Sequence, residues 1–378
     1  MAGPLRILHL HSSFSLGGKE ARAVRLMNAW GDRARHVIVS GVPDALGARE
    51  RIDRGIAYEI AQDAPPLTGR PSVARYEAIA RFMRPFDLVL SYNWGAIDGV
   101  MARRVFGKAA PPLIHHEDGF NADEAGGLKA ERNMYRRVAL PAAAALVVPS
   151  RTLEEIALKT WKQPAERVQR IGNGVATARY AAPPDPRGIP GLVRREGEVV
   201  IGAVAGLRPV KNLPMLVRAC GGLRGRFRLV IVGEGTEEEA IRRAAQMMGI
   251  TDRLVMPGFL PQSDRFTGLF DIAALSSSSE QVPLAVMEAM AAGLPVVSTP
   301  VGDVPTMVAE LNLPYVTDAT AEVQLRDRLQ ILLDRADVRA AVGAANRAKA
   351  QAEFDEGAMI RRYADLYAAV AGRPGVLG

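Results

Sequence analysis

The chain lacks the features that mark secreted, membrane-spanning and disordered proteins. Cys220 is its only cysteine, so no disulfide can form within the chain, and no basic stretch followed by an apolar core opens it as a signal peptide would. The longest apolar stretch, residues 138–148, is shorter than the roughly 18 residues that span a bilayer and is interrupted by Pro141. Hydrophobic residues at 48% and charged residues at 24% are typical of a globular protein. We therefore expect a folded protein in a reducing, cytoplasmic setting.

Aromatic residues are also scarce, at 6%, and no nucleic-acid-binding module is recognisable, although the formal net charge is +7. Residues 1–185 contain 26 Lys and Arg residues against 19 Asp and Glu residues, whereas residues 186–378 contain 22 of each. A basic half without stacking residues or a binding motif is a poor match to nucleic acid. The uneven distribution of charge is more informative than its total.

Short apolar runs alternate with helical patterns, and 378 residues exceed what one hydrophobic core usually organises. The runs that we expect to form strands are residues 5–10, 36–39, 87–90, 112–115, 144–148, 199–204, 227–232, 254–256, 272–275 and 295–298. The patterns that we expect to form helices are residues 20–30, 72–83, 213–220, 237–248 and 284–292. This alternation predicts two α/β domains, each with a parallel sheet covered on both faces.

The densest Pro and Gly segment, residues 183–191, disfavours a helix or a central strand. We expect this segment to link a domain of residues 1–185 to a domain of residues 186–352. The chain ends in an amphipathic pattern over residues 358–370, and its apolar stripe needs a surface on which to be buried.

Two carboxylates stand eight residues apart in the segment Ser276 to Met290, at a predicted junction of loop and helix. If the helix begins near Pro283, its first amides favour an anion in the loop, and Glu288 faces the same crevice as Glu280 one turn further in. A pair of carboxylates can accept hydrogen bonds from the vicinal hydroxyls of a sugar or a ribose. The alternative is a capped surface helix whose acids are solvated.

This segment resembles the signature of the family 4 retaining glycosyltransferases of the GT-B fold, with Glu280, seven intervening residues, Glu288 and then Ala-Met-Ala-Ala-Gly-Leu-Pro-Val-Val. Other segments resemble the family in the same order. These are Asn-Gly-Val in residues 169–175, Arg-x-x-Lys in 203–212, Gly-x-Gly in 229–235 and Pro-Gly-Phe in 257–259. The resemblance extends over nearly the whole chain and is strongest from residue 170 to residue 310.

The resemblance implies an α/β protein with two facing Rossmann-like domains and a cleft between them. Residues 1–185 would form the acceptor-side domain, residues 186–352 the donor-binding domain, and a helix within residues 353–378 would cross back to the first domain. The implied reaction transfers a sugar from a nucleoside diphosphate sugar, most commonly a UDP-sugar, to an acceptor hydroxyl with retention. It needs neither a metal nor a cofactor, and the implied acceptor is a glycan or lipid of cell-envelope synthesis.

The resemblance also implies roles for individual residues. Glu280 would contact the donor sugar, Glu288 the ribose, and Arg208 with Lys211 the diphosphate. Arg offers a planar fork and Lys a mobile point charge, which suits a phosphate that gains charge as the leaving group departs. The remaining implied donor-binding residues are Gly17, Gly18, Gly233, Gly258, Phe259, Val282, Pro283 and Leu284.

The glycine pair Gly17-Gly18 follows the first predicted strand. Without side chains there, backbone amides can approach phosphates, and the resemblance places such a loop over the donor diphosphate. The chain has neither Gly-x-Gly-x-x-Gly in this loop nor a P-loop motif. These absences disfavour a dinucleotide-dependent dehydrogenase and a P-loop kinase.

A cluster of histidines and acids, residues 115–118, follows another predicted strand, at the edge where open α/β sheets bind ligands. Related transferases carry a His-x-x-His-like segment here, and in that alignment Asp118 replaces the sugar-facing histidine. Asp118, His116 and Glu117 all remain candidates for the group nearest the reacting sugar. A metal site is disfavoured, because no second group of ligands stands at a diagnostic spacing.

The acceptor side is less clearly marked, with Lys19 and Asn93 as its candidates. Two basic stripes at helical spacing predict reversible contact with an anionic membrane, because basic helices with exposed apolar residues rest on anionic headgroups. The first stripe comprises Lys19, Arg22 and Arg25. The second comprises Lys129, Arg132, Arg136 and Arg137, beside Met134, Tyr135 and Val138. The alternative is that both stripes are ordinary solvated faces.

Two other functions remain open. A nucleotide-sugar epimerase of the same double-Rossmann architecture would use the acids and histidines of residues 115–118 for proton transfer. A catalytically silent scaffold is disfavoured, because Glu280, Glu288, Arg208 and Lys211 are all present.

Overall fold

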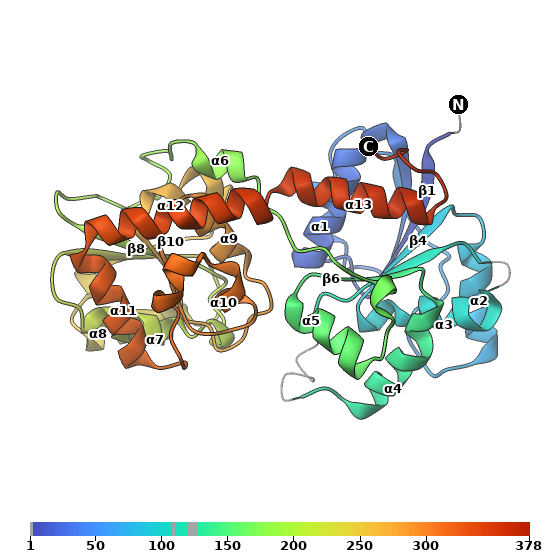
Figure 1. Cartoon of the computed structure of the whole chain (residues 1–378), viewed down its shortest axis with the longest axis horizontal. Helices are drawn as coiled ribbons and strands as arrows, with labels where there is room; N and C mark the ends of the chain where they lie inside the picture. Colours follow the sequence, from blue (N-terminus) through green and yellow to red (C-terminus); the bar gives the residue numbers. More distant parts are fainter. Residues whose placement is uncertain (1–2, 108–109, 120–126) are drawn as a thin grey trace. The chain divides into compact units, whose positions relative to one another are not determined.

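The computed structural model describes residues 3–107, 110–119 and 127–378. The chain divides into two compact units (Figure 1). Unit 1 comprises Met1–Gly172 and Ala358–Gly378, and unit 2 comprises Asn173–Gly357. Each unit is built on its own parallel sheet, as the alternating pattern of the sequence predicts.

Unit 1 contains a seven-stranded sheet in the order β3-β2-β1-β4-β5-β6-β7. The strands are β1 (Leu5–His11), β2 (Ala34–Ser40), β3 (Tyr58–Ile60), β4 (Leu88–Tyr92), β5 (Leu113–His116), β6 (Ala145–Val148) and β7 (Val168–Arg170). The strand order reverses at β1, which pairs with β2 on one side and β4 on the other. In open α/β sheets, ligands bind at the carboxyl ends of the strands beside such a reversal.

Helices cover both faces of this sheet, because alternate side chains of each strand point to opposite faces. Leu8 and Leu10 of β1 pack with helices on one face, whereas Leu5 and Ile7 pack on the other with α1 and the terminal helix α13. The helices of unit 1 are α1 (Gly18–Trp30), α2 (Val73–Met83), α3 (Ile97–Phe106), α4 (Ala130–Ala139), α5 (Arg151–Glu155) and α13 (Glu356–Val370).

Unit 2 contains a five-stranded sheet in the order β10-β9-β8-β11-β12. Its strands are β8 (Val199–Val204), β9 (Phe227–Val232), β10 (Leu254–Gly258), β11 (Ile272–Leu275) and β12 (Val296–Ser298). Its helices are α6 (Thr177–Ala181), α7 (Leu213–Gly221), α8 (Glu238–Met247), α9 (Leu284–Ala291), α10 (Val304–Met307), α11 (Glu322–Asp334) and α12 (Ala336–Glu353). Residues of α7, α8 and α11 form the core on one face, and residues of α9, α10 and α12 form the core on the other.

The Pro-rich segment 183–191 does not join the two units. It lies within unit 2, where the amide of Asp185 donates to the carbonyl of Arg265 at 2.7 Å and Ile189 is buried in the core. A β-carbon on Gly188 would approach the Arg265 carbonyl to 3.1 Å, so the segment is packed closely. The chain passes between the units at residues 172/173 and 357/358 instead of at the expected 185/186 and 352/353. Prolines excluded a helix there, but they did not prevent packing.

The terminal helix α13 packs on unit 1, beside α1 (Figure 1). Met359, Tyr363 and Tyr367 share a core cluster with strands β1, β4 and β5. The apolar stripe predicted for residues 358–370 is therefore buried in this cluster.

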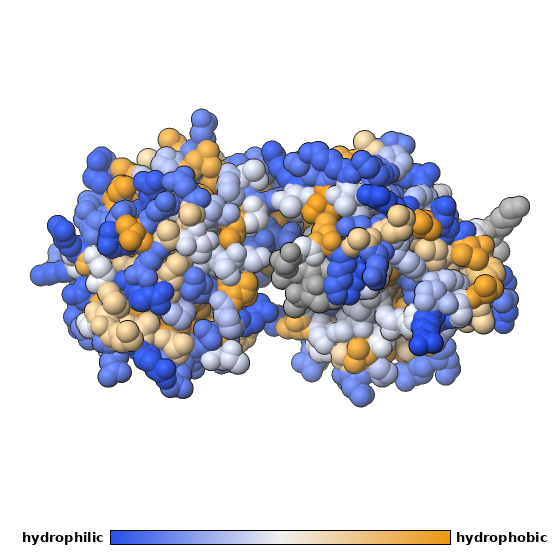
Figure 2. Space-filling view, turned by 90° about the horizontal axis from the view of Figure 1, so that it is seen from below, coloured by the Kyte–Doolittle hydropathy of each residue, from blue (hydrophilic) through white to orange (hydrophobic). Residues whose placement is uncertain are grey.

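No helix in the described ranges combines the length and apolar character needed to cross a bilayer. Figure 2 shows hydrophilic residues over much of one face of each unit, with hydrophobic residues in small groups among them.

Candidate active site

In unit 2, the predicted donor-binding loops gather at one edge of the sheet. Parallel strands end at the same edge, so the loops after β8, β9, β10 and β11 become neighbours. These loops carry Arg208 and Lys211, Gly233, Phe259, and Glu280 respectively. Residues far apart in the sequence therefore meet in space.

The centre of this edge is an ion pair between Lys211 and Glu280. Lys211 Nζ lies 2.5 Å from Glu280 Oε1, and the Ser277 hydroxyl donates to the same oxygen at 2.7 Å. Both charged side chains are mostly buried, at 16% and 12% exposure. The pair joins a cation suited to phosphate with a carboxylate suited to sugar hydroxyls.

Backbone contacts hold the two loops of this pair together. The amide of Ser278 donates to the carbonyl of Val210 at 2.8 Å, and the Ser276 hydroxyl donates to the carbonyl of Lys211 at 2.9 Å. Arg208, three residues before Lys211, is exposed to solvent. The pair is thus fixed, whereas the Arg208 guanidinium is accessible to a ligand.

Glycines are required where the loops after β8 and β9 cross. Gly233 has φ +143°, and a β-carbon there would lie 1.9 Å from the Ala205 carbonyl. Gly235 has φ +152°, and its β-carbon would lie 2.3 Å from the Leu207 carbonyl. A side chain at either position would push the loops apart. The Gly-x-Gly turn therefore places the Arg208 loop.

The loop after β10 presents an exposed aromatic ring. Gly258 has φ +84°, in the left-handed region that favours glycine. The next residue, Phe259, is 58% exposed, and its amide donates to Glu234 Oε1 at 3.3 Å. An exposed ring on an anchored loop can pack against the flat face of a ligand.

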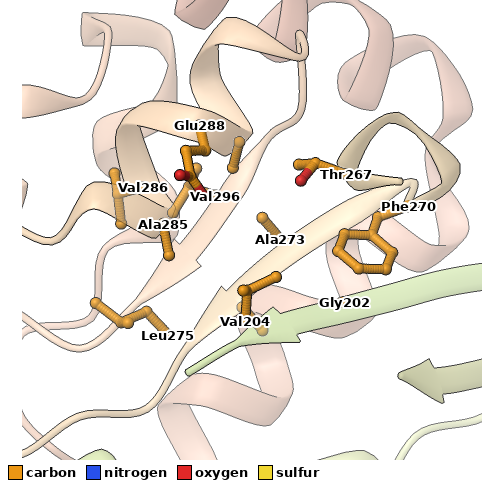
Figure 3. A pocket seen from close by; sticks show the side chains of 12 residues that line it. Gly202, Val204, Thr267, Phe270, Ala273, Leu275, Ala285, Val286, Glu288 and Val296 are labelled. Atoms are coloured by element: carbon orange, nitrogen blue, oxygen red, sulfur yellow. The ribbon is translucent and has the colours of Figure 1, made fainter. Parts of the chain in front are cut away.

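Helix α9 begins at Leu284, immediately after Pro283, as the sequence predicts. Val282 and Pro283 precede its first turn, and Glu288 lies in its second turn. Glu288 projects among the residues that line a small, mainly apolar pocket, opposite Thr267 and Phe270 (Figure 3).

Tyr180 of α6 is a neighbour of Glu288. Burial, followed by the charge of Glu288, raises the pKa of the Tyr180 hydroxyl, and the two side chains are hydrogen-bonded. The Tyr180 hydroxyl also lies 2.8 Å from Ser263 Oγ. Tyr180 therefore holds the Glu288 carboxylate in place.

In unit 1, the Gly17-Gly18 pair forms the start of α1. Gly17 is the residue before the helix, and a β-carbon on it would meet the Glu20 carboxylate at 2.8 Å. A β-carbon on Gly18 would meet nothing within 4 Å. Lys19 forms an ion pair with Glu20, so its charge is partly neutralised. Among the described residues, a β-carbon on Gly17 would approach only the end of the Glu20 side chain, so packing by itself requires glycine at neither position.

The four residues of the histidine and acid cluster have different environments. His115, His116 and Glu117 are completely buried, whereas the Asp118 side chain retains 12% exposure. Glu117 is paired inside the unit with the buried Arg136, at 3.2 Å. Burial lowers the pKa of His116 to about 3. Of the four, only Asp118 reaches the surface.

Arg22 holds Asp118 with a two-pronged contact. The distances are 2.5 Å from Nη1 to Oδ1 and 2.8 Å from Nη2 to Oδ2. Burial by itself would raise the pKa of Asp118, but the charge and hydrogen bonds of Arg22 lower it below its usual value. The Asp118 amide also donates to Asn93 Oδ1 at 2.7 Å. The carboxylate of Asp118 is consequently held by Arg22, and its backbone amide is held by the side chain of Asn93.

The two predicted basic stripes are only partly on the surface, and this corrects the expectation that all their cations face outward. Arg22 is 5% exposed and Arg136 is completely buried. Each is instead committed to an acid of residues 117–118. Helical spacing alone could not identify the face that the unit buries.

Three contributors were missed from the sequence: Arg22 as a partner of Asp118, Ser277 and Tyr180. The serine run beside Glu280 was a local signal for Ser277. Arg22 and Asp118 are 96 residues apart, and no pattern in the sequence joins them. Among the described residues, no cluster of His, Cys, Asp or Glu has the composition of a metal site.

Comparisons with known proteins agree with this arrangement of loops. A family model described as Glycosyltransferase Family 4 matches residues 16–179, and one described as Glycosyl transferases group 1 matches residues 189–349. The chain belongs to the family 4 glycosyltransferases. Both sheets of this family 4 protein lie largely within the matched ranges.

Two curated relatives and one solved structure are similar to this family 4 chain. An amylovoran biosynthesis glycosyltransferase of Erwinia amylovora is 32% identical over 43% of this chain and 43% of its own length. A D-inositol 3-phosphate glycosyltransferase of Acidothermus cellulolyticus is 28% identical over 69% of this chain and 64% of its own length. The chain thus spans less than two thirds of these relatives.

The solved structure is that of Anabaena HepE in complex with UDP. It is 19% identical, has a TM-score of 0.78, and the match covers 97% of this chain and 100% of that one. This likeness shows the two-domain, Rossmann-like GT-B fold.

Proposed function

We propose that this protein is a retaining glycosyltransferase that moves a sugar from a nucleoside diphosphate sugar to an acceptor hydroxyl. The observation that carries the proposal is the Lys211–Glu280 pair at the carboxyl edge of unit 2, with Arg208 exposed beside it. One loop junction thereby offers two cations for a diphosphate and a carboxylate for sugar hydroxyls. Family membership and the relatives' printed activities support the same conclusion.

In the proposed reaction, the diphosphate binds Arg208 and Lys211, and Glu280 accepts hydrogen bonds from the donor sugar. The bond between the anomeric carbon and the phosphate oxygen breaks, and its electron pair goes to that oxygen. The acceptor oxygen forms its bond on the same face of the sugar, and its proton passes to the departing phosphate. The two cations stabilise the charge that develops, so no metal is required for it.

The remaining donor contacts follow from the loops of unit 2. Glu288, held by Tyr180, accepts hydrogen bonds from the ribose, and Phe259 packs against the base. UDP is the first nucleotide to test, because the similar HepE structure is a complex with UDP.

Asp118 is the group of residues 115–118 that we assign to the donor sugar. It reaches the surface, whereas His116 and Glu117 are buried among partners. Its lowered pKa makes it a hydrogen-bond acceptor and not a proton donor.

We also propose that the acceptor is a membrane-borne glycan or lipid of cell-envelope polysaccharide synthesis. The amylovoran relative supports the polysaccharide class. The basic first half of the chain and an exposed face of α4 support a membrane location. That face carries Arg137, with Met134 at 57% and Val138 at 42% exposure. Each cation adds about 1 kcal/mol at an anionic surface, so binding is reversible and sensitive to salt.

Sedimentation with liposomes tests the membrane proposal. At low salt, the protein binds anionic vesicles and not neutral ones, and Met134→Asp weakens this binding severalfold. Val323→Asp changes an equally exposed residue of unit 2 and leaves binding unchanged. Equal sedimentation with both lipids would contradict the proposal and redirect attention to a soluble acceptor.

The transfer reaction is tested in two stages. Thermal unfolding against a panel of nucleoside diphosphates and their sugars identifies the donor, because a ligand that binds the native state raises Tm. Release of nucleoside diphosphate is then measured with and without acceptor extracts. Release that depends on acceptor supports transfer, whereas conversion of the donor to its epimer without acceptor would show an epimerase. Binding with neither reaction would show a silent scaffold.

A further inference from the structure

All five histidines of the chain are buried in unit 1, and none lies in unit 2. They are His9, His11, His36, His115 and His116, each at most 1% exposed. Buried polar groups need hydrogen-bond partners. Three of these histidines find their side-chain partners in two hydrogen-bonded groups.

One group joins His36, His9 and Tyr92, and the other joins Tyr367 of the terminal helix to His116. His36 Nδ1 lies 2.9 Å from His9 Nε2, and His9 Nδ1 lies 3.3 Å from the Tyr92 hydroxyl. Tyr92 shares its buried cluster with Tyr367, and Tyr367 Oη lies 2.6 Å from His116 Nε2. The five side chains come from β1, β2, β4, β5 and α13.

The contact of His116 with a backbone carbonyl fixes the direction of its bond with Tyr367. His116 Nδ1 lies 3.3 Å from the carbonyl oxygen of Ser91, which can only accept, so Nδ1 carries the proton. A neutral His116 then accepts at Nε2, and Tyr367 must donate to it. The Tyr367 hydroxyl is therefore the donor, and His116 the acceptor, of the bond that joins α13 to β5.

The terminal helix supports both members of the Arg22–Asp118 pair. Tyr367 binds His116, two residues before Asp118, and the Arg22 guanidinium carbon lies 5.6 Å from the centre of the Tyr363 ring. The His116 ring is also stacked on Tyr92, with 4.7 Å between the ring centres. The end of β5 is thus held by one strong hydrogen bond from α13.

We propose that Tyr367 is a positioning residue for the transfer reaction: it acts through His116 to hold Asp118 against the donor sugar. The inference rests on the proposed function, in which Asp118 contacts that sugar. Tyr367 touches neither substrate nor reacting atoms. Its hydroxyl fixes the tautomer and the ring orientation of His116, and these fix the backbone that ends in Asp118.

The matched test compares Tyr367→Phe with Tyr363→Phe in the full chain. The two tyrosines lie one turn apart on α13, but the buried Tyr363 hydroxyl has no hydrogen-bond partner among the described residues. Tyr367→Phe lowers kcat about tenfold and changes donor KM less than twofold, since displacement of a contact at the reacting sugar slows the reaction. Tyr363→Phe keeps both values within twofold. Equal effects of the two variants would overturn the proposal.

Two NMR measurements test the proposal without activity. Long-range ¹H–¹⁵N spectra of protein labelled at histidine place the proton of His116 on Nδ1. A proton on Nε2 of His116 would overturn the assignment of Tyr367 as the donor to it. In Tyr367→Phe, the ¹³C titration of Asp118 moves to higher pH by about half a unit, because the pair with Arg22 loosens. An unchanged titration would overturn the link to Asp118.

The same measurements separate this inference from the proposed function. If wild-type protein transfers no sugar but Tyr367→Phe shifts the Asp118 titration, the positioning link stands and the transfer proposal fails. If wild-type protein transfers sugar and Tyr367→Phe matches it in kcat, transfer stands and the positioning role fails.

Discussion

The two units place their polar groups differently, although both are parallel sheets covered by helices. Unit 2 presents its charges on loops, where the Lys211–Glu280 pair retains access to solvent and Arg208 is exposed. Unit 1 keeps all five histidines inside, together with Tyr92 and Tyr367, and only Asp118 of the 115–118 cluster reaches the surface. The exposed Arg208 is accessible to a ligand, whereas buried hydrogen bonds such as that between Tyr367 and His116 are costly to break. The comparison suggests that unit 2 binds charge and that unit 1 supplies rigid geometry.

The largest difference that we expect between the units is in stability at low pH, where unit 1 should lose more stability than unit 2. Burial lowers the pKa of His36 to about 4 and that of His116 to about 3. Histidines in the unfolded chain titrate near 6.5, so the unfolded state binds more protons between these values and stability falls as pH decreases. The stabilisation is fully present above about pH 6.5 and is lost progressively below it. At pH 5 the loss is about 2 kcal/mol for each histidine.

Hydrogen exchange at pH 7 and pH 5, corrected for intrinsic rates, checks this difference. Protection in the strands of unit 1 falls by several kcal/mol, and protection in unit 2, which has no histidine, changes much less. A uniform loss of protection across both sheets would contradict the assignment of acid sensitivity to the buried histidines.

Removing the diphosphate cations should give the next largest effect. Arg208→Ala and Lys211→Ala each lower turnover about a hundredfold or more, the scale of losing one donor that stabilises developing charge. Steady-state transfer rates measure this effect. Arg218→Ala is the control, because Arg218 is a partly exposed cation of α7 paired with Glu322. Near-normal rates for the first two variants would remove the diphosphate assignment.

A change at Asp118 tests whether unit 1 contributes a carboxylate in a fixed position. Asp118→Asn preserves the shape of the side chain but removes its charge beside Arg22, so transfer falls about tenfold or more while binding of bare nucleoside diphosphate changes little. Calorimetry and transfer rates provide the two readouts. Equal losses in both would indicate a folding defect. If His116→Ala abolishes transfer and Asp118→Asn does not, His116 and not Asp118 is the group that matters.

The smallest of these effects should come from Glu288. A ribose contact is similar in the ground state and the transition state, so Glu288→Ala raises donor KM about tenfold and leaves kcat nearly unchanged. Tyr180→Phe should produce a weaker version of the same change, because it removes the hydroxyl that holds Glu288. Donor affinity equal to that of the wild type in Glu288→Ala would contradict the ribose assignment.

Much of the fold could be predicted because buried parallel strands appear as apolar runs. The expected strands at residues 199–204, 227–232 and 272–275 coincide with β8, β9 and β11. The short strands β3 and β7 were missed, since three residues carry little pattern. The helices that were missed are α3, α5, α6, α10, α11 and α12.

Within the candidate site, local pattern was sufficient for some features and not for others. The start of α9 after Pro283 could be predicted from neighbouring residues, whereas the Gly-x-Gly turn at Gly233 was expected only from the family resemblance. The Pro-rich segment 183–191 was predicted as a linker, because composition reports which local structures are excluded and not what a segment packs against.

The sequence by itself determined the alternation of strands and helices, the glycine turns and the residue types available for a diphosphate and a sugar. These depend on local backbone preference and on the periodicity of apolar residues. Only the tertiary structure decided the partners. Arg22 meets Asp118 across 96 residues, Lys211 meets Glu280 across 69, and Tyr367 meets His116 across 251. Strand order and helix packing create these contacts, and neither is encoded in any short stretch of the chain.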